Sequence, residues 1–131
     1  MQAITAYAAT LIIFTVIDLI WLGFIAKGFY RTQLAGLMAD KINVAVAGLF
    51  YLVYALGISI FAVAPQLASG SWKDAFVTGA LFGFFAYAVY DLTNLATLKN
   101  WPLALTIVDL AWGSLLTGMS AALTVMIVRG I

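Results

Sequence analysis

The sequence of 131 residues contains no cysteine, no histidine and no glutamate. The absence of cysteine excludes disulfides, thiol redox chemistry and thiolate metal ligands. The absence of histidine excludes His-ligated zinc, haem or di-iron sites and any Ser-His or Cys-His nucleophile pair. We therefore predict neither a metal site nor a cofactor. Because glutamate is absent, the five aspartates are the only side-chain carboxylates.

Charged residues are also scarce, at 8% of the chain, whereas a soluble domain carries about 25%. Hydrophobic residues make up 66% and the mean hydropathy is +1.13. This composition predicts an integral membrane protein surrounded by the lipid bilayer. The net charge of +1 offers no basic patch, so we expect no nucleic-acid partner.

The apolar runs predict an all-α protein, a bundle of four transmembrane helices. At roughly 20 residues per span the length leaves room for about four spans, and therefore for a single domain over residues 1–131. The N-terminus lacks the basic region and cleavage site of a signal peptide and is interpreted as the first span. The predicted helices cover about 3–25, 43–64, 72–98 and 102–128.

Local signals suggest how these helices begin and end. Pro65 is expected to stop the second helix, because proline disrupts the helix interior. Asn100 is a candidate cap for the fourth helix, after a tight turn reading "LKNWP". The longest connection, residues 27–41, carries apolar and aromatic side chains between basic ones. It predicts a short interfacial helix between the first two spans.

The basic residues indicate the orientation of the spans. Four of them fall in the 1–2 and 3–4 connections, namely Lys27, Arg31, Lys41 and Lys99. The opposite side carries only Lys73, Arg129 and the amino terminus. Positive-inside reasoning therefore places the two connections in the cytoplasm and both termini outside it.

Three of the aspartates fall inside predicted spans, at similar distances from the cytoplasmic ends. Asp18 lies seven residues before Ile25, and Asp91 and Asp109 lie seven residues from their own helix ends. At 1.5 Å per residue, each is roughly 10 Å inside the boundary. The tight 3–4 turn makes an antiparallel hairpin in which Asp91 and Asp109 face each other. We predict a site in this half of the bundle, completed by Asp18.

Polar-capable neighbours lie at helical spacing from each aspartate, on the same helix face. They are Thr15 and Trp21 beside Asp18, Tyr87 and Asn94 beside Asp91, and Thr106 and Trp112 beside Asp109. An ionised aspartate at the centre of a span costs about 2.5–3.5 kcal/mol on insertion scales. Desolvation and mutual repulsion favour a proton on at least one of the three, unless Lys27, Arg31 or Lys99 reaches down by snorkelling.

The alternative is that the three aspartates serve packing alone, through hydrogen bonds between helices worth about 0.6 kcal/mol each on average. Two further patterns are weighed in the same way. "DLIW" at 18–21 and "DLAW" at 109–112 look like a repeat, but in opposed helices the two tryptophans should point to opposite sides of the aspartates. The Gly79–Gly83 pair permits close helix contact, within the chain rather than between chains.

The segment "YDLTNLATLKNWPL" followed by "VDLAWG", with "VIDLIWLGFIAKGFYR" near the N-terminus, resembles domain-of-unknown-function family 2177. This resemblance extends over nearly the whole chain. It implies a small four-helix protein of the bacterial inner membrane. It implies no activity that can be transferred to particular residues.

Three functions remain open. The first is binding or transport of a small molecule, cation or proton at the aspartates. The second is an enzyme that acts on a lipid or isoprenoid by proton transfer, with Asp18, Asp91 and Asp109 as candidate catalytic residues. The third is a structural subunit that associates with another membrane protein, or a homodimer. Whether any reaction is catalysed stays open at this stage.

Overall fold

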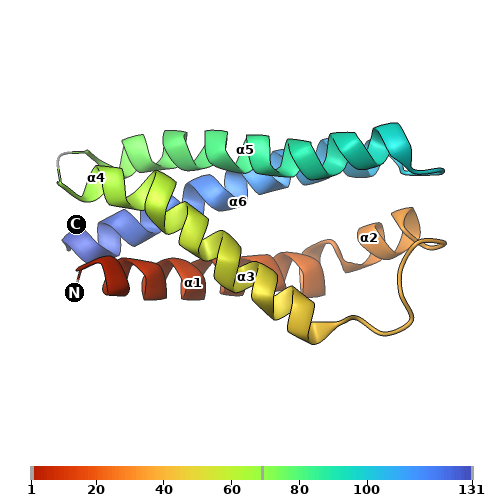
Figure 1. Cartoon of the computed structure of the whole chain (residues 1–131), viewed down its shortest axis with the longest axis horizontal. Helices are drawn as coiled ribbons and strands as arrows, with labels where there is room; N and C mark the ends of the chain where they lie inside the picture. Colours follow the sequence, from red (N-terminus) through yellow and green to blue (C-terminus); the bar gives the residue numbers. More distant parts are fainter. Residues whose placement is uncertain (1, 69, 131) are drawn as a thin grey trace.

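The computed structural model describes residues 2–68 and 70–130, and every regular element within them is helical. In Figure 1, α marks α-helices and η marks short π-helical segments that continue them. The elements are α1 (Gln2–Ile20), η1 (Trp21–Ile25), α2 (Lys27–Gln33), α3 (Val44–Ile58), η2 (Ser59–Val63), α4 (Ala64–Ala68), α5 (Trp72–Thr97) and α6 (Leu103–Arg129).

Four helical stretches are long and apolar enough to cross a membrane, namely Gln2–Ile25, Val44–Ala68, Trp72–Thr97 and Leu103–Arg129. The short helix α2 lies between the first two. The predicted fold class is therefore confirmed, including the helix in the first connection. In Figure 1, α1 begins and α6 ends at one end of the bundle, while α2 and the α5–α6 turn lie at the other.

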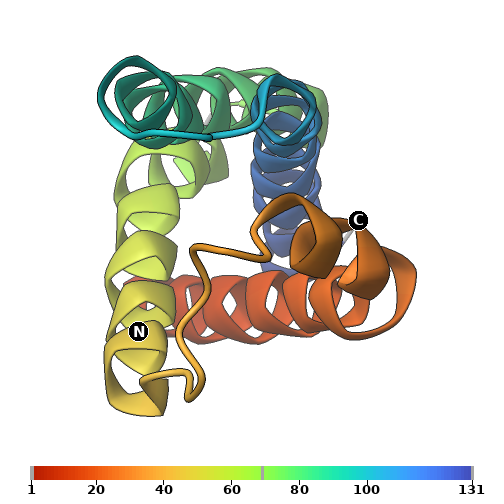
Figure 2. The same ribbon diagram turned by 90° about the vertical axis from the view of Figure 1, so that its right-hand side faces the viewer.

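The four stretches form a ring in the order α1, α3, α5, α6, which Figure 2 shows from the α2 end. Helix α6 is the most buried of the four stretches, since about half of its apolar segment lies inside the protein. All four stretches expose large apolar side chains on their outer faces, such as Ile12, Leu49, Phe85 and Ile107. Such faces contact lipid in a membrane protein, so the lipid bilayer is the surrounding partner.

Helices α5 and α6 pack closely because glycine removes side chains from their contact. A Cβ atom added at Gly79 would come within 2.8 Å of the Thr117 carbonyl oxygen. One added at Gly83 would overlap the Gly113 carbonyl, and one at Gly113 would overlap the Tyr87 ring. The glycines therefore serve packing within the chain, as interpreted from the sequence.

Pro65 does not stop the second span, so this expectation is wrong. The span continues through the proline as α4, immediately after the π-helical segment η2. At the end of η2 the Ala64 N–H donates to the Ser59 carbonyl, five residues back. A π-helical turn changes the hydrogen-bond ladder locally, and a proline that cannot donate is accommodated where the regular i to i−4 pattern is already interrupted.

The end of α5 and the start of α6 also differ from the expectation. Asn100 does not cap α6; it adopts a left-handed conformation with φ 63°, which asparagine tolerates better than most residues. Pro102 occupies the N-cap position itself and provides no side-chain cap. The left-handed residue reverses the chain within a very short connection. The turn thereby keeps α5 and α6 adjacent along their length.

Helix α3 crosses the bundle, and this crossing positions the site. Its first part packs on α1, whereas its last turns and the following segments η2 and α4 pack on α5. In Figure 1, α3 accordingly runs from the α1 side near α2 to the α5 side near α4. The α2 end of the bundle is left with a space between α3 and α5.

Candidate functional site

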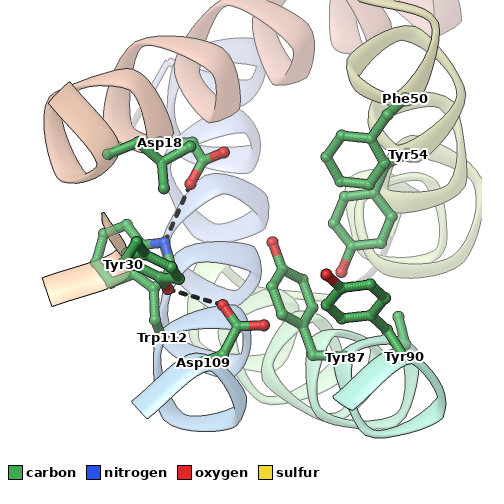
Figure 3. A pocket seen from close by; sticks show the side chains of 10 residues that line it. Asp18, Tyr30, Phe50, Tyr54, Tyr87, Tyr90, Asp109 and Trp112 are labelled. Atoms are coloured by element: carbon green, nitrogen blue, oxygen red, sulfur yellow. Dashed lines mark hydrogen bonds between the residues drawn. The ribbon is translucent and has the colours of Figure 1, made fainter. Parts of the chain in front are cut away.

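A cavity of about 430 Å³ occupies this space, beneath α2. Side chains from all four membrane-spanning stretches and from α2 form its wall, as Figure 3 shows. Its polar members are two carboxylates, one indole and four phenols: Asp18, Asp109, Trp112, Tyr30, Tyr54, Tyr87 and Tyr90. The rest of the wall is apolar. The cavity therefore combines aromatic faces with carboxylates inside the bundle.

Asp18 is held by two hydrogen bonds from other helices. Tyr51 of α3 donates its hydroxyl to one carboxylate oxygen at 2.7 Å, and Trp112 of α6 donates its indole N–H to the other at 3.1 Å. The carboxylate is only 6% exposed. Because both oxygens accept a bond from a neutral donor, Asp18 ties α1 to α3 and α6 without a basic partner.

Asp109 is held by a chain of two donors from η1 and α2. Trp21 donates its indole N–H to the Tyr30 oxygen at 3.2 Å, and the Tyr30 hydroxyl donates to Asp109 at 2.8 Å. Burial, followed by the charge of Asp109, raises the pKa of Tyr30, so its hydroxyl remains protonated and acts as the donor. Tyr30 lies in α2, and this bond fixes α2 over the cavity.

The two tryptophans do not point to opposite sides of the aspartates. The Trp21 and Trp112 rings are stacked, with centroids 4.2 Å apart and planes inclined by 11°. The expectation is wrong because α1 and α6 are staggered: Trp112 reaches Asp18, while Trp21 serves Asp109 through Tyr30. The tryptophan of each "DLxW" motif thus helps to hold the aspartate of the other helix. The two motifs are still interpreted as local motifs and not as halves of a repeat.

Asp91 differs from the other two aspartates because it has no donor. It is 0% exposed and does not line the cavity. Neither of its oxygens meets an N–H or O–H donor among the described residues. The Tyr87 ring meets Gly113 of α6, and this register of the antiparallel α5–α6 hairpin sets Asp91, one turn further along α5, beside Asp109. Asp109 in turn lines the cavity. A functional pairing of the two carboxyl groups stays a prediction.

The remaining predicted site residues divide into two groups. Tyr87 lines the cavity, and Figure 3 shows its hydroxyl pointing into it. Asn94 is half-buried and lies outside the cavity wall. The Thr15 hydroxyl is buried at a groove between α1 and α3, without a hydrogen-bond partner in the described structure. Thr106 bonds Trp101 and the Pro102 carbonyl in the first turn of α6.

Sequence reasoning missed the tyrosines that reach the site from α2 and α3. Tyr51 binds Asp18, and Tyr54 shares a hydrogen bond of 2.8 Å with Thr117 on α6. The available signal was "YLVY" in an otherwise apolar helix, where two phenols three residues apart share a face. Tyr30 was interpreted as a membrane-surface residue, and its inward direction depends on the backbone after η1.

Basic side chains take no part in this site. Lys27, Arg31 and Lys99 are exposed, and the donors that reach Asp18 and Asp109 are phenols and indoles. The three aspartates also do not converge as ligands around a metal ion would, among the residues described. The site is therefore an aromatic cavity with two carboxyl groups and, among the described residues, no basic side chain in its wall.

These features define a small multi-pass helical membrane protein with a polar cavity at one end of its bundle. Comparison with protein families places the chain more narrowly. The chain belongs to the family DUF2177, described as a predicted membrane protein, and the match covers residues 3–126. This confirms the resemblance seen in the aspartate-containing segments. Searches of curated proteins and of solved structures found no match.

Proposed function

We propose that the protein binds a small organic cation, such as a substituted ammonium ion, in the cavity beneath α2. The observation that carries this proposal is the composition of the wall. Carboxylates of Asp18 and Asp109 stand beside the rings of Tyr54, Tyr87 and Trp112, and no basic side chain is part of the lining. A cation is attracted by carboxylates and by aromatic faces, and aromatic cages bind quaternary ammonium groups in this way.

The size of the cavity agrees with a small ligand. Its volume of about 430 Å³ lies within the range of roughly 300–1,000 Å³ that small-molecule sites occupy. The same charge that favours a cation disfavours phosphate or carboxylate ligands, since like charges repel inside a medium of low dielectric. A neutral ligand would not supply the positive charge that the carboxylates of the wall lack.

An apolar groove supports a ligand with a hydrophobic part. The groove lies between α3 and Phe82 of α5, has a volume of about 470 Å³, and shares Phe50 and Tyr54 with the cavity. Because its other lining residues are apolar and the exposed faces of these helices contact lipid, a hydrophobic substituent can extend from the cavity toward the bilayer. We propose that the ligand enters along this route.

The location of the site follows from the charge distribution. The end of the bundle near the cavity carries the basic residues of the two connections, including Lys27, Arg31 and Lys99. Under the positive-inside rule this end faces the cytoplasm. We therefore propose a bacterial inner-membrane protein with both termini outside and a cation site in the cytoplasmic half.

The test is a binding measurement with benzyltrimethylammonium, which is permanently charged and aromatic. Calorimetry on the purified protein in lipid nanodiscs should show binding that weakens at least tenfold in Asp109→Asn. That change corresponds to about 1.4 kcal/mol. The matched control is Asp40→Asn, because Asp40 is exposed and lies outside the cavity lining.

The charge requirement is tested with the uncharged carbon isostere of the same molecule, neopentylbenzene. Competition by the isostere should be much weaker than competition by the cation. Equal affinity of the wild type and Asp109→Asn for the cation would contradict the proposal. Equal competition by the isostere would show that the cavity accepts any apolar molecule of this size.

A further inference from the structure

Asp91 is a buried carboxyl group that the cation site alone does not explain. It is 0% exposed, lies outside the cavity wall and has no N–H or O–H donor among the described residues. A buried, unpartnered carboxylate is unfavourable because desolvation penalises its charge. The register of the α5–α6 hairpin, in which the Tyr87 ring meets Gly113, sets Asp91 beside Asp109 of α6.

We propose that Asp91 and Asp109 share one proton in the ligand-free protein and release it when a cation occupies the cavity. The inference rests on the proposed function and adds its coupling to protons. Two carboxyl groups form a hydrogen bond only if one of them carries a proton. Two carboxylates in one site are not both ionised when they stand this close without a counter-charge.

The surroundings of the pair contain no group that would replace the proton. From α6 the facing group is Asp109 itself, and from α5 the phenols of Tyr90 and Tyr87 interact with the pair. The other segments packed on α5, which are η2 and α4, contain no titratable residue. Tyr30 donates to Asp109 from α2, and Asp18 across the cavity accepts bonds from two neutral donors.

The exchange balances in charge and in atoms. The ligand-free pair carries one proton and one negative charge. When a cation binds beside Asp109, its positive charge lowers the cost of ionising the second carboxyl group. The O–H bond then breaks, and the proton leaves to water through Asp109, which is 8% exposed and lines the cavity. One cation enters and one proton leaves, so the net charge of the site is unchanged.

The linkage between proton release and cation binding sets the direction in which pH changes the affinity for the cation. Because binding releases a proton, affinity for a permanently charged cation should rise with pH, by up to about tenfold per pH unit while the pair remains protonated. In Asp91→Asn the amide cannot release a proton, and the affinity should become nearly independent of pH. Asp40→Asn should retain the pH dependence of the wild type.

The first experiment needs no ligand. Infrared spectroscopy of the protein in nanodiscs at neutral pH should show the C=O stretch of a protonated carboxylic acid, and Asp91→Asn should lack it. Absence of the band in the wild type, or its persistence in Asp91→Asn, would overturn the shared proton. If Asp91→Asn fails to fold, the band should persist in Asp18→Asn, which leaves the pair intact, and its loss there would overturn the shared proton.

The second experiment counts protons on the wild type alone. Calorimetry of benzyltrimethylammonium binding in buffers of different ionisation enthalpy should give one proton released per cation. Binding with no proton release would overturn the exchange and leave the proposed function intact. A complete lack of binding would overturn the proposed function and the exchange with it, while the infrared band would still decide whether the pair holds a proton.

Discussion

The four helices pack differently at the two ends of this bundle. Around the chain termini the interior consists of small side chains such as Ala6, Ala62, Ala75 and Ala121, all buried. Around α2 the interior consists of long aromatic side chains and carboxylates that surround a cavity. Small residues let helix backbones approach closely, whereas tyrosine and tryptophan keep them apart. We name these the closed end and the cavity end.

The hydrogen bonds differ in the same way. At the closed end the threonines bond mainly to their own helices: Thr10 donates to the Ala6 carbonyl and Thr124 to the Ser120 carbonyl, each at 2.8 Å. At the cavity end the bonds of Asp18 and Asp109 all join different helices. The closed end is therefore stabilised mainly by close packing of helices, whereas the cavity end is stabilised by hydrogen bonds between long side chains of different helices. Five predictions test this contrast.

The largest effect is expected where α5 meets α6. A valine at position 83 would overlap the Gly113 carbonyl and Thr117, so Gly83→Val should lower stability by at least about 1–3 kcal/mol, the usual cost of overpacking. Thermal denaturation in nanodiscs measures the effect. Gly48→Val is the control, because a Cβ atom there meets nothing within 4 Å. Equal melting temperatures for the two variants would contradict the close packing of this contact.

The next effect is expected at the cavity end, in Tyr51→Phe. Removing this hydroxyl leaves one oxygen of the buried Asp18 without its donor, which should cost about 1–3 kcal/mol. The same melting experiment measures it. Tyr7→Phe is a matched control, since the Tyr7 hydroxyl donates to the Leu52 carbonyl at an exposed position. If Tyr7→Phe is the more damaging change, the bonds to Asp18 do not hold the cavity end together.

A smaller effect is expected in Tyr30→Phe, which removes the donor that joins α2 to Asp109. The loss should be about 1.5–3 kcal/mol for a bond to a charged group if Asp109 is ionised, and about 1 kcal/mol otherwise. It should be confined to the docking of α2, so global melting should change less than in Tyr51→Phe. Trypsin should cleave after Lys27 and Arg31 faster than in the wild type. Tyr90→Phe is the control, because Tyr90 lies in α5 and its hydroxyl makes no hydrogen bond to α2 within the described residues.

Alkaline pH should reproduce the Tyr30 effect. Burial raises the folded-state pKa of Tyr30 above its ordinary value of 10.0, so the stabilisation is present below pH 10 and is lost as the pH rises further. Trypsin sensitivity of α2 should therefore increase above pH 10 in the wild type but not in Tyr30→Phe. An identical response in both would assign the change to another group.

The smallest effect is expected in Thr10→Val at the closed end. The change removes a bond of 3.2 Å to Thr124 and one to the carbonyl of its own helix, and polar contacts between membrane helices average about 0.6 kcal/mol. Valine has nearly the same shape, so the packing is kept. A loss of stability as large as that of Tyr51→Phe would contradict the proposed difference between the closed end and the cavity end.

Much of the fold could be predicted because the signals are local. Apolar runs of membrane-spanning length predict four spans whatever their neighbours, and both the fold class and the family are confirmed. Pro65 shows the limit, since its effect depends on the π-helical segment before it. That residues 1–131 form one domain stays a prediction, as does the functional role of each proposed site residue.

The register of α5 against α6 could be predicted, but the contacts of the site could not. Counting residues from the helix ends brought Asp91 and Asp109 together, because a short turn fixes the register of a hairpin. The stagger of α1 against α6 is set by packing between helices distant in sequence. It decides that Trp112 binds Asp18 and that Trp21 stacks on Trp112.

The sequence by itself determined that this protein lies in a membrane, how many times it crosses and which carboxylates it buries, because hydrophobicity and helix length act residue by residue. Only the tertiary structure decided that α3 crosses the bundle, that Tyr30, Tyr51 and Tyr54 reach inward from α2 and α3, and that Asp91 has Asp109 as its neighbour. These features depend on how separate helices pack against one another, and periodicity along one helix does not record the position of another.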